Sequence, residues 1–110
     1  MIEKIILNYL IKKLKVHVYM EEQKEKEESY VVIEKLGSAR VDRINRASFA
    51  VQSYAESMEE AAILNEKVVG AMLKIIESED IGSVKLDSDY NFTDTQTKRY
   101  RYQAVFDLYY

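Results

Sequence analysis

One segment of the chain has the side-chain spacing of a calcium loop. Residues 87–91 read Asp-Ser-Asp-Tyr-Asn, which places oxygen-bearing side chains as at the start of an EF-hand loop. Such a loop needs glycine at its sixth position for a sharp turn and a bidentate glutamate at its twelfth. Here these positions hold Phe92 and Lys98. We therefore expect no metal at this segment, and we interpret residues 87–97 as a polar loop rich in turn-forming residues.

The other residues that enzymes commonly use for catalysis are few or scattered. His17 is the single histidine and there is no cysteine, so one chain cannot assemble a Ser-His-Asp triad, a multi-histidine site or a thiolate metal site. Three separated glycines form no phosphate-binding loop. Carboxylates are numerous, but their clusters fall in expected loops, and nothing places two of them across a pocket. We expect a protein that is not an enzyme and uses no cofactor, with His17 packing beside Tyr19 on a strand.

Basic and aromatic residues alternate in residues 98–102, which read Lys-Arg-Tyr-Arg-Tyr. Proteins that bind single-stranded nucleic acid combine these residue types on one exposed surface. On a strand, however, successive side chains point to opposite faces, so the arginines and tyrosines of this segment separate. Tyr100 and Tyr102 then continue a packing stripe with Phe106 and Leu108. The pattern favours core or subunit packing over base stacking.

Tyrosine is abundant, with nine tyrosines and no tryptophan. A tyrosine buries a large ring while its hydroxyl stays in water, a combination that suits subunit interfaces. Residues 109 and 110 are both tyrosine, so we expect the last strand to be tied down or to meet another subunit. The run 22–28 is fully polar, which indicates either a solvated hairpin loop or a loop that orders on a partner. The candidate interface residues are Tyr100, Tyr102, Tyr109, Tyr110, Glu22, Glu25, Glu27 and Glu28.

Length and composition predict one folded domain, residues 1–110. Hydrophobic residues make up 47% of the chain, which argues against disorder. A net charge of −3 argues against general attraction to nucleic acid. No apolar run is long enough to span a bilayer, and the apolar start of the chain is interrupted by Glu3 and Asn8, unlike a signal peptide. The lack of cysteine suits a reducing compartment such as the cytosol.

Residues 46–77 form the unit around which the rest of the chain is organised. Its first ten residues alternate as a strand, and residues 58–77 carry an apolar stripe at helical spacing. Between them, Ser57 and Glu60 have the spacing of a capping box, in which the serine accepts a hydrogen bond from the third helical amide. Gly70 lies inside this helix at a cost of about 1 kcal/mol against alanine, which close packing would offset.

Hydrophobic periodicity predicts one further helix and four further strands. Residues 2–14 have helical spacing, and the strands beside the central one are expected at residues 15–21, 30–36, 84–87 and 99–110. Gly37-Ser38 indicates a turn, and residues 38–45 are ambiguous. Arg40, Arg43 and Arg46 are candidates for a small basic patch.

This order of elements, α-β-β-β-α-β-β, predicts an α+β fold. Short hairpin links between the strands imply an antiparallel sheet of about five strands, because a tight turn reverses the chain direction. Both helices are then expected to pack on one face of that sheet.

The chain resembles the tail terminator proteins of long-tailed bacteriophages and prophages, also called tail completion or minor capsid proteins. The resemblance lies in the first helix ending near Leu14, the strand 30–33, and the strand 49–55 (Phe-Ala-Val-Gln-Ser-Tyr-Ala) that enters a helix through Ser57. The closing strand 100–110 also fits the family. The acidic segment 21–28 departs from it, since a less acidic connection is usual there.

The resemblance implies a mechanical function. Proteins of this family form a ring, usually a hexamer, on the finished tail tube; the ring stops further tube subunits from adding and provides the docking surface for the head connector. DNA passes through the lumen without specific binding, which a net acidic chain suits. The expected location is the tail–head junction of the virion, after assembly in the cytoplasm of the bacterial host. The expected partners are other copies of the chain, the tail tube protein and the head–tail connector proteins, with no membrane.

Two other interpretations remain at this point. One is a small α+β binding or regulatory module, such as another phage neck protein, which would be a monomer or dimer with a pocket. The other is a small hydrolase or transferase. Formation of a ring distinguishes the tail terminator from both.

Overall fold

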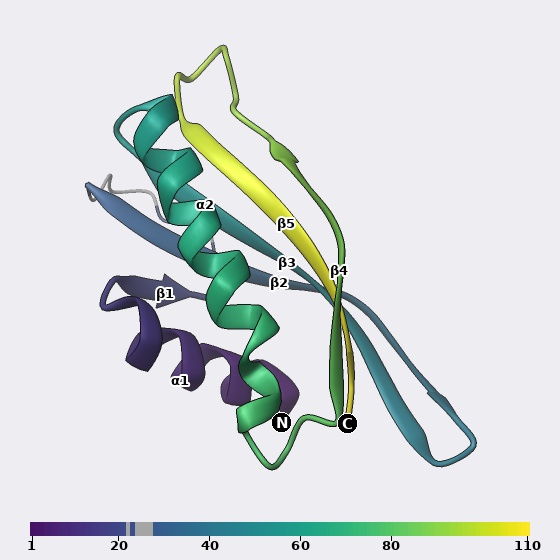
Figure 1. Cartoon of the computed structure of the whole chain (residues 1–110). Helices are drawn as coiled ribbons and strands as arrows, with labels where there is room; N and C mark the ends of the chain where they lie inside the picture. The colour runs from purple at the N-terminus through teal and green to yellow at the C-terminus, as the bar shows by residue number, and fades with distance from the viewer. Residues whose placement is uncertain (22, 24–27) are drawn as a thin grey trace.

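A five-stranded sheet carries two helices on one face (Figure 1). The computed structural model describes residues 1–21, 23 and 28–110. The elements are α1 (Ile2–Leu14), β1 (His17–Tyr19), β2 (Ser29–Val41), β3 (Ile44–Ala55), α2 (Met58–Leu73), the 3-10 turn η1 (Ile75–Glu77), β4 (Ser83–Asn91) and β5 (Tyr100–Tyr109). The predicted α+β class and the predicted order α-β-β-β-α-β-β are confirmed.

The strands lie in the order β1-β2-β3-β5-β4. Every neighbouring pair is antiparallel except β1 and β2, which are parallel, with Val18 opposite Val31. The expected hairpin between the first two strands is therefore wrong, because parallel neighbours cannot be joined by a simple reversal. The alternating pattern of residues 15–21 indicates a strand but carries no information on the direction of its partner. Residues 22 and 24–27 of this connection lie outside the described residues.

The core lies between the sheet and the two helices. Phe49 and Val51 of β3 and Phe106 of β5 are fully buried there, and Phe49 and Phe106 are direct cross-strand partners. The helices contribute Ile2, Ile6, Leu10, Leu64, Val68 and Met72. Burying each large apolar side chain contributes about 1.5–3 kcal/mol, so this layer supplies most of the driving force for folding. The predicted two-residue alternation of β3 and β5 is confirmed.

Helix α2 begins where the capping signal predicts. The backbone amide of Glu60 donates to Oγ of Ser57 at 3.1 Å, which satisfies one of the free amides of the first turn. The regular helix ends at Leu73, and η1 continues the chain with tighter turns, so the expected single helix to residue 77 is two segments.

The expected turn at Gly37-Ser38 is wrong. Strand β2 passes a bulge between Lys35 and Gly37 and continues to Val41, and the chain reverses at Asp42 and Arg43. Both turn residues have positive φ, 50° and 68°, as a two-residue type I′ hairpin requires.

Strand β4 is longer than its alternation predicts. It runs to Asn91 past a register shift between Leu86 and Ser88, so the expected polar loop at residues 87–97 begins as a strand. A bulge adds one residue to one strand and inverts the inward and outward alternation beyond it. The two-residue pattern therefore breaks at each bulge although the strand continues.

The two helices are joined by a hydrogen bond. The Tyr9 hydroxyl on α1 donates to the carbonyl oxygen of Ala71 on α2 at 2.7 Å. Burial, and secondarily the charge of Glu77, raises the pKa of Tyr9 above its ordinary value. The protonated phenol is the form that makes this contact.

Replacing Gly70 with alanine is expected to raise the free energy of unfolding by about 1 kcal/mol. A Cβ at Gly70 meets no atom within 4 Å, so close packing inside the chain does not explain this glycine. Gly82→Ala is the contrast, since its Cβ lies 3.2 Å from the carbonyl oxygen of Tyr109. Urea denaturation of both variants measures the difference. A destabilised Gly70→Ala variant would show that this glycine does have a packing role within the chain.

Replacing Tyr9 with phenylalanine is expected to lower the free energy of unfolding by about 1 kcal/mol at neutral pH, because Ala71 loses its donor. The folded-state pKa of Tyr9 is above the unfolded value of 10.0, so its contribution is complete below pH 10.0 and is lost as pH rises through the folded-state pKa. Denaturation at neutral pH and above pH 10.0 should show a shallower alkaline decline in the variant. Identical alkaline slopes would show that Tyr9 does not contribute to the pH dependence.

Candidate functional site

The tyrosines expected at an interface lie on both faces of β5. Tyr100 and Tyr102 share the face of Ala104, toward the helices, whereas Tyr109 lies on the opposite face. All four terminal-strand tyrosines are half-buried. Tyr110 exchanges two backbone hydrogen bonds with Asn45, of 2.9 and 3.1 Å, so the end of β5 is tied to the start of β3. The four rings do not form one surface patch.

The glutamates of the candidate interface are described in part. Glu28 is exposed immediately before β2. Glu22, Glu25 and Glu27 lie outside the described residues.

The most prominent surface feature is the far end of the β2–β3 hairpin, which we call the arm (residues 36–46). It projects beyond the helices, and the whole molecule measures 44 × 25 × 22 Å (Figure 1). Three large apolar side chains of the arm are mostly in solvent: Leu36 is 52% exposed, Val41 65% and Ile44 53%. Arg40 and Arg43 are also exposed, and Arg46 lies 3.6 Å from Asp107, so the three arginines of the expected patch lie on one projection. Exposed apolar groups gathered on one projection are typical of a contact site.

The two edges of the sheet differ. β1 covers only Tyr30–Val32 of β2, so the rest of β2 has no strand beside its outer edge in the described part of the chain. Its outermost stretch, Gly37-Ser38-Ala39, is uncharged and exposed. The other edge, β4, carries Lys85, Asp87 and Asp89 together with a register shift, and charges and bulges oppose the addition of another strand.

The face of the sheet opposite the helices carries a row of aromatic and arginine side chains, which we call the open-face row. Tyr30 and Tyr54 stack with ring centroids 4.6 Å apart, and Tyr19 meets Tyr30 edge-on at 6.0 Å. The Arg101 guanidinium lies 5.6 Å from the ring centre of Tyr54 and 4.4 Å from that of Phe92. The arginines and tyrosines of residues 98–102 do point to opposite faces, but the arginines meet tyrosines from β2 and β3. Sequence spacing within one strand could not indicate this contact, because it depends on β3 lying beside β5.

Hydrogen bonds fix the open-face row. Arg101 donates from Nε to the carbonyl of Phe92 at 2.7 Å and from Nη1 to the Tyr54 hydroxyl at 2.8 Å. The Tyr54 hydroxyl donates to Gln52, whose amide donates to Gln103 at 2.8 Å. Tyr30 and Tyr54 are each 3% exposed, so side chains cover the centre of this face and form a small second core.

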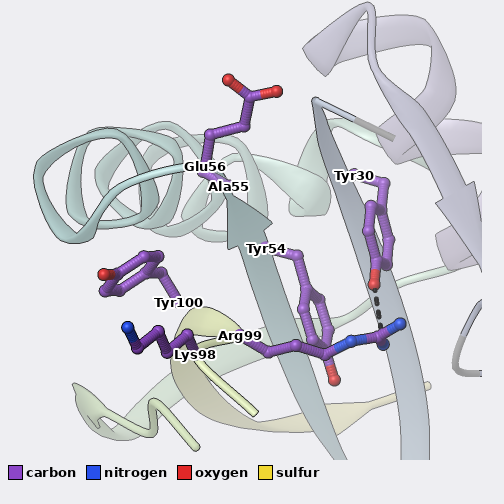
Figure 2. Close-up of a pocket in the computed structure, with 7 residues that line it drawn as sticks. All are labelled: Tyr30, Tyr54, Ala55, Glu56, Lys98, Arg99 and Tyr100. Carbon is purple, nitrogen blue, oxygen red and sulfur yellow. Dashed lines mark hydrogen bonds between the residues drawn. The ribbon is translucent and has the colours of Figure 1, made fainter. Parts of the chain in front are cut away.

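A shallow pocket of 230 Å³ lies at one end of this row (Figure 2). Its basic residues, Lys98 and Arg99, come from the turn before β5, which Asp94 organises. Hydrogen bonds from the Thr97 side chain and the Gln96 backbone hold the pKa of Asp94 below its ordinary value. Figure 2 shows the Arg99 side chain reaching Tyr30, to whose hydroxyl it donates at 3.3 Å.

This pocket has the chemistry to hold a small anion. Lys98, Arg99 and the Tyr100 phenol carry hydrogen-bond donors, and the Glu56 carboxylate points away from them (Figure 2). Its volume is below the roughly 300–1,000 Å³ of typical ligand pockets.

The segment with calcium-like spacing is part of β4. Its residues alternate between faces, and Asp89 lies 3.5 Å from the Asn65 amide of α2. Among the described residues, no three histidine, aspartate or glutamate side chains group as metal ligands. Within the same residues, no helix is long and apolar enough to cross a membrane.

Comparison with protein families and with curated proteins found no match to this chain.

Replacing Arg101 with lysine is expected to lower the free energy of unfolding by about 1–2 kcal/mol, because lysine keeps the charge but cannot make both hydrogen bonds or stack on both rings. The matched control is Arg40→Lys on the exposed arm, which should stay within about 0.5 kcal/mol of the parent. Chemical denaturation measures both. Equal stability of the two variants would show that the open-face row does not stabilise the sheet.

Proposed function

We propose that the protein is a structural component of long-tailed phage assembly. It caps the completed tail tube as a ring, most simply a hexamer, stops addition of tube subunits and provides the docking surface for the head connector. It acts at the tail–head junction of the virion after assembly in the host cytoplasm, and DNA crosses its lumen without specific binding.

The observation that carries the proposal is the arm. A monomer gains nothing from holding Leu36, Val41 and Ile44 in water on a paired hairpin, because burying such side chains is worth about 1.5–3 kcal/mol each. Contact with a neighbouring subunit would recover that free energy. The sequence resemblance to tail terminators supplies the identity of the assembly.

The difference between the two edges supports a capping role. A cap needs one surface that binds other subunits of its own assembly and a second surface to which no further subunit can bind. The uncharged outer stretch of β2 suits strand pairing, whereas the charged, irregular β4 does not. Growth by strand addition would therefore stop at β4.

The pocket at the end of the open-face row favours a second candidate, a small binding module without ring formation. Lys98, Arg99 and the phenol of Tyr100 would bind a small anionic ligand there. The pocket is small, and Tyr30 and Tyr54 in its lining are almost fully buried, so we rank this function below assembly.

Electron microscopy of the purified protein, alone and mixed with tail tubes, tests the proposal. We expect closed rings of one diameter, or rings on tube ends only, and tubes that no longer elongate after the protein is added. The matched sample is the same protein at low concentration, which separates a ring present in solution from one formed on the tube.

Monomers at every concentration, with uncapped tubes that continue to elongate, would contradict the proposed function. A saturable anion-binding signal from such a monomer, abolished by Arg99→Gln, would support the binding module instead.

A further inference from the structure

We propose that the arm of one subunit docks into a groove at the opposite end of a second copy of the chain. The groove lies where the end of α1, the start of β2 and the start of α2 meet. The contact supplies the subunit interface of the ring proposed above and rests on that proposal for its biological purpose.

The groove has an apolar floor and an acidic rim. Leu14, Val16 and Ile63 are among its apolar lining residues, and Ile63 is 46% exposed. Glu56 and Glu60 stand at its rim beside Lys67, and the groove has a volume of 270 Å³. Glu28 also lines it. Three carboxylates against one ammonium give the lining of the groove a net negative charge.

The tip of the arm has the complementary chemistry. Val41 and Ile44 are cross-strand partners, so they form one apolar pair at the end of the hairpin. Arg43 precedes Ile44 in the turn and Arg46 shares the face of Ile44 on β3, whereas Arg40 is exposed on the opposite face of the hairpin, paired with Asn45. Asp42 is the single acid of the turn. An apolar pair on the apolar floor, with guanidinium groups against the rim carboxylates, matches both the hydrophobic and the charge pattern.

The arm and the groove of one molecule lie too far apart to touch, so the proposed contact joins two copies of the chain. β3 begins on the arm at Ile44 and ends beside the groove at Ala55. A straight strand of that length spans about 36 Å. Figure 1 shows the arm and the start of α2 at opposite ends of the molecule.

The contact is also heterologous, since arm and groove are different surfaces. A repeated heterologous contact generates a ring when its rotation closes and a filament when it does not. This is the class of interface that a cap on a tube needs, whereas a symmetric patch would yield a dimer.

Cysteine cross-linking tests the contact directly, because the chain has no cysteine of its own. The variant with Ile44→Cys and Ile63→Cys should form, on oxidation, a ladder of covalent oligomers that ends at the ring size. The matched control combines Ile44→Cys with Ile76→Cys, a position of similar exposure (54% against 46% for Ile63) that does not line the groove. The proposal is overturned if the first pair gives no more cross-linking than the control.

Charge exchange tests the same contact without cysteine. Arg40→Glu with Arg43→Glu on one chain, or Glu28→Arg with Glu56→Arg on another, should each weaken self-association by about tenfold or more. All four residues are exposed, so both variants should keep the melting temperature of the parent. Mixing the two variants should restore association, since every arm then meets a groove of opposite charge.

The outcomes separate the contact from the function. Rings or capped tubes with no effect of either test would overturn the docking proposal and leave the capping function in place. Cross-linking and charge rescue without any capping of tubes would support the contact and contradict the function. Loss of tube capping with an intact ring in the Arg40→Glu, Arg43→Glu variant would assign the arm to the tube and overturn the docking proposal.

Discussion

The structure depends on the burial of β3 on all sides. Its neighbours β2 and β5 take up its backbone hydrogen bonds along nearly its whole length. The helices cover Phe49 and Val51 on one face, and the tyrosine–glutamine layer covers Gln52 and Tyr54 on the other. Every residue from Phe49 to Tyr54 is buried as a result. Unpaired buried polar groups are costly, and the sheet pairs the backbone of this strand while the second core pairs the side chains of Gln52 and Tyr54. Oγ of Ser53 is the exception in this segment, since it is buried without a hydrogen-bond partner among the described residues.

In the assembly proposed above, the buried central strand would connect the two contact surfaces. The arm and the acidic groove lie at its two ends, so the relative orientation of these surfaces is set by the same buried segment. Closure of a ring depends on the angle between donor and acceptor surfaces, and small changes accumulate around the ring. In the proposed ring, packing around Phe49 and Phe106 would therefore influence ring size although neither residue reaches the surface.

Much of the fold could be predicted from local patterns. The first helix follows its apolar stripe, Ser57 caps α2 as its spacing indicates, and β5 keeps its alternation from Tyr100 onward. These features depend on residues a few positions apart, which a sequence displays directly.

The features that local patterns do not reveal depend on residues far apart in the chain. The bulges next to Gly37 and Ser88 invert the alternation of side chains. The sequence pattern therefore does not reveal that β2 continues into the arm or that β4 continues to Asn91. The parallel pairing of β1 depends on the direction in which that strand joins the sheet, and the contact of Arg101 with Tyr54 depends on β3 lying beside β5.

The strand order also governs the sequence of events during synthesis. β5 is made after β4 and yet lies between β3 and β4. In the described part of the chain, β5 is the only strand that pairs with β4. When β4 has been synthesised, the β2–β3 hairpin can already be complete. Helix α2 then has only part of the sheet to pack against, and β4 has no strand to pair with. Final closure waits for a late insertion into the middle of the sheet, which is slow in chains dominated by distant pairings and leaves apolar surface open to aggregation meanwhile.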